Sequence, residues 1–318
     1  MLRFRADVRP LLFNAVYFGL LTWAFVSVPL GNLWVSLPLF AALCLTSFMG
    51  AVQTHNAVHC PIWKQRWLNK IYQVVLTCTY GHPVSSLVPG HTLSHHKHTQ
   101  SRKDVMRTTK AQFRWHLLNG LLFLFIVAPY TMKADAAYTK MMRTRHPRWF
   151  RQMVLELSVL WAAQIALFVV DWQKALVFWF IPHIYAQWGL VGMNMLQHDG
   201  TDADHPYNHS RNFVGKTVNW WAYNNGFHGL HHMQPGLHWS VLPEKHAELV
   251  APYIHPNLDQ KSLLVYLFKT FGLNQRLDYL GNPIPLPESG PDEEWIPDPR
   301  TTAADLGAEG IEPALAGT

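Results

Sequence analysis

The chain has few charged residues and few cysteines. Asp, Glu, Lys and Arg make up 14% of its 318 residues, against about 25% in typical soluble proteins. The three cysteines, Cys44, Cys60 and Cys78, form no C-x-x-C pair, so neither a disulfide framework nor a cysteine-based zinc site is indicated. The sequence also has no G-x-S-x-G motif and no Walker lysine loop. Hydrolysis by a nucleophile elbow and P-loop phosphate chemistry therefore lack their defining residues.

Hydrophobic residues make up 49% of the chain, and 14 residues are tryptophans. The net charge is +6, but the basic residues flank apolar stretches and do not form a stripe in a polar domain. This arrangement favours a membrane protein over a nucleic-acid-binding protein, because Lys and Arg concentrate at the cytoplasmic ends of membrane helices. Arg3, Arg5 and Arg9 precede a first apolar run that is too long for a signal-peptide core. We therefore predict an uncleaved first span and a cytoplasmic N-terminus.

Four apolar stretches are each long enough to cross a hydrocarbon core of about 30 Å as helices. They cover residues 11–30, 33–51, 153–170 and 175–196, and short turns join them into two hairpins. Two shorter runs, 71–80 and 117–130, are predicted to be interfacial helices. If residues 117–130 crossed the membrane, the basic segment that follows would be exported, against the positive-inside rule. The predicted fold is an all-α integral membrane protein with four transmembrane helices and a cytoplasmic helical cap.

The composition changes after residue 280. Residues 200–280 are polar and aromatic, as expected for a cytoplasmic cap that completes a membrane domain over residues 1–280. Residues 281–318 are rich in proline, acidic residues, glycine and alanine, and have too little apolar surface to order themselves. We expect a flexible C-terminal tail. Four spans return the chain to its starting side, so the C-terminus is predicted to be cytoplasmic as well.

Nine histidines stand at the predicted cytoplasmic ends of these spans, at spacings typical of metal ligands. They are His55, His59, His91, His95, His96, His198, His228, His231 and His232. In an α-helix a four-residue step places two side chains on one face. The spacing therefore pairs His228 with His232 and sets His231 to one side. Asn194 repeats the four-residue step before His198 and is a candidate water-mediated or indirect ligand.

The same helical rule pairs His55 with His59 and His91 with His95, and it turns His96 toward a second metal. Nine imidazoles suffice for two metals. Neutral imidazole suits iron, copper, zinc or nickel, so the ligands alone leave the metal open.

Other polar residues near these histidines are open to two interpretations. Four acidic residues are close enough in sequence to accept the second N–H of a ligand imidazole, or are ordinary loop residues: Asp104, Asp199, Asp202 and Asp204. His183 lies inside the fourth predicted span. An ionisable residue there is either functional or packed as a neutral imidazole.

Four segments resemble the metal-binding motifs of one known superfamily. HNAVH (55–59), HTLSHH (91–96) and HGLHH (228–232) resemble the three histidine boxes of the membrane fatty acid desaturase and hydroxylase superfamily. NMLQH (194–198) resembles the additional Asn and His metal site of that superfamily. The similarity covers about residues 50–255. It implies four spanning helices, a cytoplasmic di-iron centre and oxidation of an unactivated C–H bond by O₂, with no catalytic residue beyond the metal centre.

Within the superfamily, HHMQPGLHWSVLPEKH resembles the third-box segment of desaturases. It favours a fatty acid desaturase, which introduces a double bond, over a hydroxylase or ketolase acting on an alkyl, lipid or carotenoid substrate. The sequence contains no haem, flavin or iron–sulfur motif. Electrons are therefore expected from an external donor such as a ferredoxin or cytochrome b5. The other expected partners are a fatty acyl or lipid substrate and the membrane, with no nucleic acid.

Two alternatives come from other classes of protein. His55 and His59 have the H-x-x-x-H step of zinc proteases, but Asn56 stands where the general-base glutamate is required. A histidine-rich metal transporter is the non-enzymatic alternative. Transport sites lie near the bilayer midplane, whereas these histidines lie beyond the apolar helix ends. Tightly held iron would favour the oxidase, and exchangeable zinc would favour the transporter.

Overall fold

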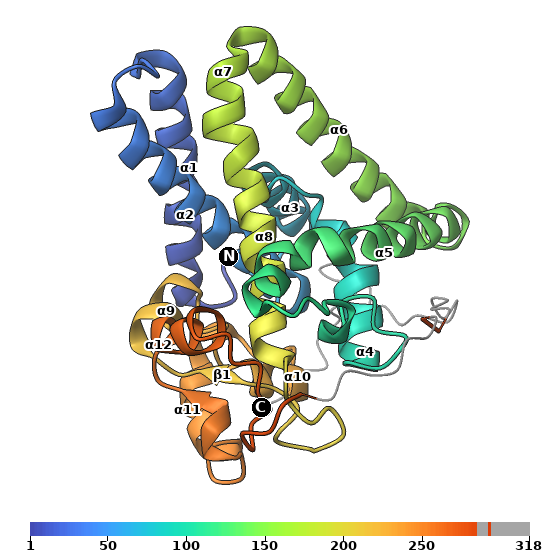
Figure 1. Ribbon diagram of the computed structural model, residues 1–318. Coiled ribbons are helices and arrows are strands. Elements are labelled where there is room, and N and C mark those ends of the chain that lie inside the picture. Colours follow the sequence, from blue (N-terminus) through green and yellow to red (C-terminus); the bar gives the residue numbers. More distant parts are fainter. Residues whose placement is uncertain (285–291, 294–318) are drawn as a thin grey trace. The chain divides into compact units, whose positions relative to one another are not determined.

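The computed structural model describes residues 1–284 and 292–293, which are mostly helical (Figure 1). The α-helices are α1 (Val8–Ser27), α2 (Leu33–His59), α3 (Arg66–Tyr80), α4 (His96–His98), α5 (His116–Arg145), α6 (Pro147–Val170), α7 (Trp172–Ala175), α8 (Ile181–His198), α9 (Lys216–Trp221), α10 (His228–Met233), α11 (Leu242–Leu249) and α12 (Leu263–Leu267). Three π-helices are η3 (Val88–His95), η5 (Leu176–Phe180) and η8 (Phe268–Gly272). The predicted flexible tail, residues 281–318, lies outside the described residues except for 281–284 and 292–293.

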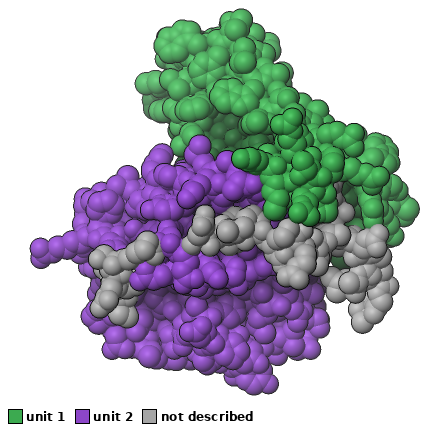
Figure 2. Space-filling model, turned by 90° about the vertical axis from the view of Figure 1, so that its right-hand side faces the viewer, with its two compact units in different colours: residues 1–88, 139–190, 300–318 green, residues 89–138, 191–299 purple. Residues whose placement is uncertain are grey.

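The chain divides into two compact units (Figure 2). The described part of unit 1 comprises residues 1–88 and 139–190, and that of unit 2 lies within residues 89–138 and 191–299. The chain passes from one unit to the other at the start of η3, within α5 and within α8.

Five helical segments in the described part of the chain are long and apolar enough to cross a membrane. They are Arg5–Ser27, Leu33–His59, His116–Arg145, Pro147–Val170 and Trp172–His198. Three of them contain the predicted spans 33–51, 153–170 and 175–196, and Arg5–Ser27 contains the first predicted span, 11–30, up to its last three residues. The fifth is α5, so the expectation that residues 117–130 form a short helix was wrong. The helix continues for 30 residues because the basic stretch after the apolar run is rich in Ala, Lys, Met and Arg, which are strong helix formers.

In unit 1 the first two helices form the predicted hairpin. Helices α1 and α2 run side by side and are joined at Gly31 and Asn32 (Figure 1). Their contact is filled by a core that also includes residues of η5: Tyr17, Leu21, Ala24, Val28, Leu39, Leu43, Phe178 and Trp179. The second hairpin turns at Asp171, whose carboxylate accepts hydrogen bonds from the backbone N–H groups of Gln173 and Lys174. This cap starts the returning helix at once.

His183 is packed inside unit 1. Its Nε2 atom lies 2.9 Å from the Tyr17 hydroxyl and 3.1 Å from the carbonyl oxygen of Cys78. Its ring meets the indole of Trp179 edge-on, with centroids 4.3 Å apart. A buried polar ring needs hydrogen-bond partners, and these contacts supply them. They support the packing interpretation of this histidine over the functional one.

Unit 2 contains the only strands in the described residues, β1 (Asn212–Phe213) and β2 (Asp259–Gln260), which pair in parallel. No strand was predicted from the sequence. This pair is too short to show the two-residue alternation on which strand prediction depends. One core cluster packs α10 against α11 and comprises Phe227, Leu230, Leu242, Val250, Ile254 and Leu258. A second joins α5 to the end of α8 and comprises Ala111, Phe123, Val127 and Met195.

Candidate metal centre

The second histidine motif lies on a helical stretch that begins as the π-helix η3 and continues as α4. A π-helix closes hydrogen bonds five residues apart, so its turn is wider than that of an α-helix, and residues five apart come closer to one face than they do in an α-helix. The Nε2 atoms of His91 and His96 are accordingly 3.1 Å apart. His95 belongs to a different group of histidines. The rings of His91 and His95 are stacked with centroids 5.7 Å apart, as the four-residue step predicts. The expectation that His96 is the residue turned toward a second metal was wrong, because His96 groups with His91 and His95 groups with the other histidines.

The third motif follows α-helical geometry. On α10 the Nε2 atoms of His228 and His232 are 3.1 Å apart, as the four-residue step predicts. The start of α10 is fixed by Asn212, whose Oδ1 accepts a hydrogen bond of 2.8 Å from the N–H of Gly229. The Asn212 amide also donates to Asp259 Oδ1 at 2.8 Å. The strand pair thus anchors the helix that carries three of the predicted ligands.

Four of the predicted histidines converge within unit 2 and are called here the four-histidine group: His95, His198, His228 and His232. Their candidate ligand atoms all lie within 4.8 Å of one another. His198, at the end of α8, is the centre of the group. Its Nε2 atom lies 3.2 Å from that of His95, 2.9 Å from that of His228 and 3.1 Å from that of His232.

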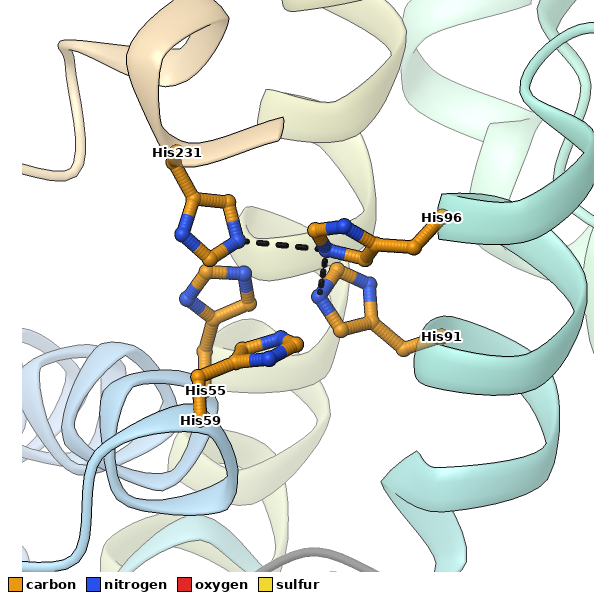
Figure 3. Close-up of side chains that lie close together, drawn as sticks. All are labelled: His55, His59, His91, His96 and His231. Atoms are coloured by element: carbon orange, nitrogen blue, oxygen red, sulfur yellow. Dashed lines mark hydrogen bonds between the residues drawn. The ribbon is translucent and has the colours of Figure 1, made fainter. Parts of the chain in front are cut away.

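Three further histidines of unit 2 form a second cluster, the three-histidine group of His91, His96 and His231 (Figure 3). The Nε2 atom of His96 lies 3.1 Å from that of His91 and 3.2 Å from that of His231. His55 and His59 belong to unit 1. There they stand one turn apart on α2, with ring centroids 5.3 Å apart and edge-to-face. The four-residue step therefore places both rings on one face of α2.

Hydrogen bonds define the tautomers of two rings in the four-histidine group. His95 Nδ1 lies 2.9 Å from a carboxylate oxygen of Asp104, and His198 Nδ1 lies 3.1 Å from the carbonyl oxygen of His209. Both partners are acceptors, so both Nδ1 atoms carry the hydrogen. A neutral imidazole then has a bare lone pair on Nε2. Two such lone pairs face each other across 3.2 Å, an arrangement that is repulsive unless a metal ion or a proton lies between them.

The nitrogen–nitrogen distances fit a metal ion. Two imidazoles at right angles around a metal ~2.1 Å away have their nitrogens ~3.0 Å apart, against ~3.4 Å in a tetrahedron. The Nε2 distances quoted above for both groups run from 2.9 to 3.2 Å. They favour ligands at right angles, which leaves room for further ligands, over a closed tetrahedral zinc site. The residues present therefore fit a metal with open coordination positions.

The surroundings keep the ligands neutral and the supporting carboxylate charged. Burial lowers the pKa of His232 well below 6.5, and the neighbouring imidazole of His96 lowers it further. Burial alone would raise the pKa of Asp104. Electrostatic attraction by the His95 ring, its hydrogen bond and the backbone N–H groups of Gln100 and Met106 outweigh burial and bring that pKa below 3.8. Such a carboxylate stays ionised and fixes the orientation of His95.

Other predicted residues have different partners. The carboxylate of Asp199 pairs with Arg276, with a closest distance of 2.8 Å. The side-chain amide of Asn194 donates to the carbonyl oxygen of Met106 at 3.2 Å. The support of His198 by the His209 carbonyl was not anticipated, because a main-chain acceptor leaves no signal in residue identities.

The fold and the two clusters define a class: helical proteins with membrane-length helices and groups of buried and half-buried histidines able to hold metal ions. The sequence model of the fatty acid desaturase family matches residues 32–259, and the chain belongs to this family. The resemblance drawn from the histidine motifs is thereby confirmed. The family implies an oxidoreductase of the desaturase and hydroxylase type, and it is known for di-iron sites. A search of curated proteins finds no match to this chain.

Proposed function

We propose that this protein is an O₂-dependent, di-iron fatty acid desaturase that introduces a double bond into an acyl chain. The observation that carries the proposal is the four-histidine group. Its buried Nε2 atoms converge, and two of them present facing lone pairs, so the group needs a cation.

Seven histidines of unit 2 would hold the two metals in a four-to-three division. The four-histidine group would bind one iron and the three-histidine group the other. We propose that His55 and His59 complete the ligand set of the three-histidine group. Their four-residue step on α2 supports this assignment, and so does the position of HNAVH as the first histidine box of the family.

Iron bound at this site would supply the oxidising chemistry that, with O₂, removes hydrogen from an unactivated methylene. The chain itself holds the ligands in place. Asp104 and the His209 carbonyl each retain a proton on Nδ1 of one ligand, which leaves Nε2 free to bind metal. Burial of His95, His198 and His228, which are at most 3% exposed, excludes water from this side of the centre. Exclusion of water protects an oxidising centre from side reactions.

The grouping of the histidines also supports four membrane crossings. Helices α5, α6 and α8 all lie between His95 and His198 in the chain, and these two side chains are in contact within unit 2. An even number of the three must therefore cross. If all three crossed, the two histidines would end on opposite sides of the membrane. We propose that α5 lies at the interface, because Lys133, Lys140, Arg143 and Arg145 occupy its second half.

We propose, by the positive-inside rule, that both histidine groups and both termini lie on the cytoplasmic side. There an external electron donor would reach the metal centre. We propose a small acidic redox protein such as a ferredoxin or cytochrome b5. The segment next to the second box supports this choice, since Lys97, Arg102 and Lys103 give it a positive charge. The substrate would be a fatty acyl lipid or thioester supplied from the membrane.

Expression in a host that lacks the activity, followed by mass spectrometry of its lipids, tests the reaction. A desaturase produces an acyl chain lighter by two hydrogens, and the double bond is then located by fragmentation. Gain of one oxygen would instead identify a hydroxylase. His198→Ala and His231→Ala should each abolish the product, whereas His146→Ala, which changes a histidine outside the predicted ligand set, should not. Full activity in either ligand variant would contradict the di-iron assignment.

Metal analysis separates the enzyme from the histidine-rich transporter. The purified protein should hold about two irons per chain that resist dialysis. A chain that holds readily exchangeable zinc, and moves it across vesicles, would refute the proposal.

A further inference from the structure

The four-histidine group is centred on the end of α8. His198 is its last residue, and Asp199 and Gly200 follow directly. Asp199 is only 5% exposed. Arg276 binds both oxygens of its carboxylate, through Nε at 2.9 Å and a terminal nitrogen at 2.8 Å. A bidentate guanidinium–carboxylate pair fixes direction as well as distance, so it fixes the residue next to His198.

The same guanidinium reaches a second support of the group. Its other terminal nitrogen donates to the carbonyl oxygen of Ala111 at 2.7 Å. Ala111 is the last residue of the segment 104–111. This segment begins with Asp104, the residue that orients His95. Arg276 therefore connects the main chain that carries one ligand, His198, to the segment that orients another, His95.

Backbone contacts hold Arg276 at this place. The N–H of Tyr279 donates to the carbonyl oxygen of Gly200 at 3.0 Å. Gly200 has a φ of +72°, and a Cβ there would lie 2.8 Å from the carbonyl oxygen of Leu277. Only glycine allows this close approach of the two chain segments. The segment around Arg276 is thus packed directly against the turn that follows His198.

We propose that Arg276 is a positioning residue for the metal centre, which acts through Asp199 to set the position of His198. The proposal rests on the proposed function, since it requires that the four-histidine group bind a metal. Arg276 lies beyond residues 32–259, the part of the chain that matches the family. The four-histidine group thus depends on a residue outside the histidine boxes and outside the matched region.

A second arginine holds the same helix end in a different way. Arg211, 2% exposed, donates through one terminal nitrogen to the carbonyl oxygens of Leu196 and Asp199, at 2.7 and 2.9 Å. These contacts satisfy carbonyls at the helix end, which lack partners within the helix. Arg211 keeps the helix end formed, whereas Arg276 ties it to the Asp104 segment. The two arginines therefore have separate roles.

Release of Co²⁺ from the full-length protein tests the proposal. Co²⁺ binds imidazole sites, and its visible absorption bands report the geometry of its ligands. The protein would be purified in detergent, loaded with Co²⁺ and mixed with excess chelator. Two bound ions should leave in two phases. Arg276→Gln should accelerate one phase by about 10–100-fold, the usual effect of losing a residue that supports a ligand, and should shift the Co²⁺ bands.

Matched variants show whether faster release of Co²⁺ comes from loss of the Arg276–Asp199 pair. Arg276→Lys keeps the charge but loses the bidentate geometry, so its release rate should fall between those of the wild type and Arg276→Gln. Asp199→Asn should resemble Arg276→Gln, and the double variant should be no worse than either single change. Arg114→Gln, which alters an exposed arginine of the same unit, should have no effect. If Arg276→Gln fails to fold, Arg276→Lys and Asp199→Asn carry the test.

The outcomes are distinct for the two proposals. Unchanged release and unchanged bands in the Arg276 and Asp199 variants would overturn the positioning role. Equal acceleration of both phases would also overturn it, because it would show general loss of stability. A wild-type protein that binds neither Co²⁺ nor iron would overturn the proposed function itself.

Discussion

Replacement of Asp104 by Asn should weaken metal binding at the four-histidine group. Asp104 is fully buried, and its carboxylate receives three donors. They are His95 Nδ1 at 2.9 Å, the N–H of Gln100 at 2.9 Å and the N–H of Met106 at 2.8 Å. Asparagine has nearly the same shape. However, it replaces one acceptor oxygen by an NH₂ group, which is a donor. This NH₂ group must then face at least one of the three N–H donors.

The size of the effect follows from these contacts. A hydrogen bond to a charged group contributes about 1.5–3 kcal/mol, and a buried donor left without a partner costs a comparable amount. His95 and Gln100 donate to one carboxylate oxygen and Met106 to the other, so part of this cost falls on the fold at Met106 and part on His95, whose charged acceptor becomes at best a neutral amide oxygen. We expect metal affinity to fall by about 10–100-fold, or ~1.4–2.7 kcal/mol.

The assay is competition between the purified protein and a chelator of known affinity, at constant pH. Asp171→Asn is the matched control. Its carboxylate also accepts two backbone N–H groups, those of Gln173 and Lys174, but no histidine. Asn and Asp are nearly equivalent at a helix start, so the control should keep both its metal affinity and its stability. Wild-type metal affinity in the Asp104 variant would refute the argument that this carboxylate orients a ligand.

Three further predictions concern pH, backbone and packing. Burial lowers the pKa of His232 below 6.5, so the unfolded chain takes up the proton first. Stability and bound metal should therefore be complete above pH 6.5 and decline below it, as a pH titration of metal content would show. Gly200→Ala should cost about 1–3 kcal/mol because of its positive φ, measured as a lower Tm. Tyr17→Phe should cost about 1 kcal/mol of unfolding free energy with metal content unchanged; lost metal would show that His183 is more than a packing residue.

The sequence was sufficient to identify the histidines that come together in unit 2. Imidazoles at short fixed steps on helices have few arrangements, so His228 and His232 had to share a face. The α1–α2 hairpin was equally predictable, since two long apolar runs separated by Gly31 and Asn32 have no other compact solution.

The pairing within the second box was not predictable by the same rule. The α-helical step predicts His91 beside His95, and their rings are indeed stacked, but η3 is a π-helix and also brings the Nε2 atom of His91 to that of His96. A π-turn inserts one extra residue per turn, and its hydrogen bonds are no better than those of an α-helix. Tertiary contacts therefore decide where it occurs, and residue identities over eight positions do not record them.

The residues that support the ligands show why distance along the chain is a poor guide to contact. Asp199 follows His198 directly, but successive residues of a helix point about 100° apart. Its carboxylate therefore turns away from the metal centre to Arg276, 77 residues later. Asp104 lies nine residues beyond His95 and reaches its ring, because the chain folds back through a turn at Gln100, which has a φ of +61°. Which residues support a metal centre therefore depends on where loops fold back toward the ligands. Only the three-dimensional structure shows where this happens.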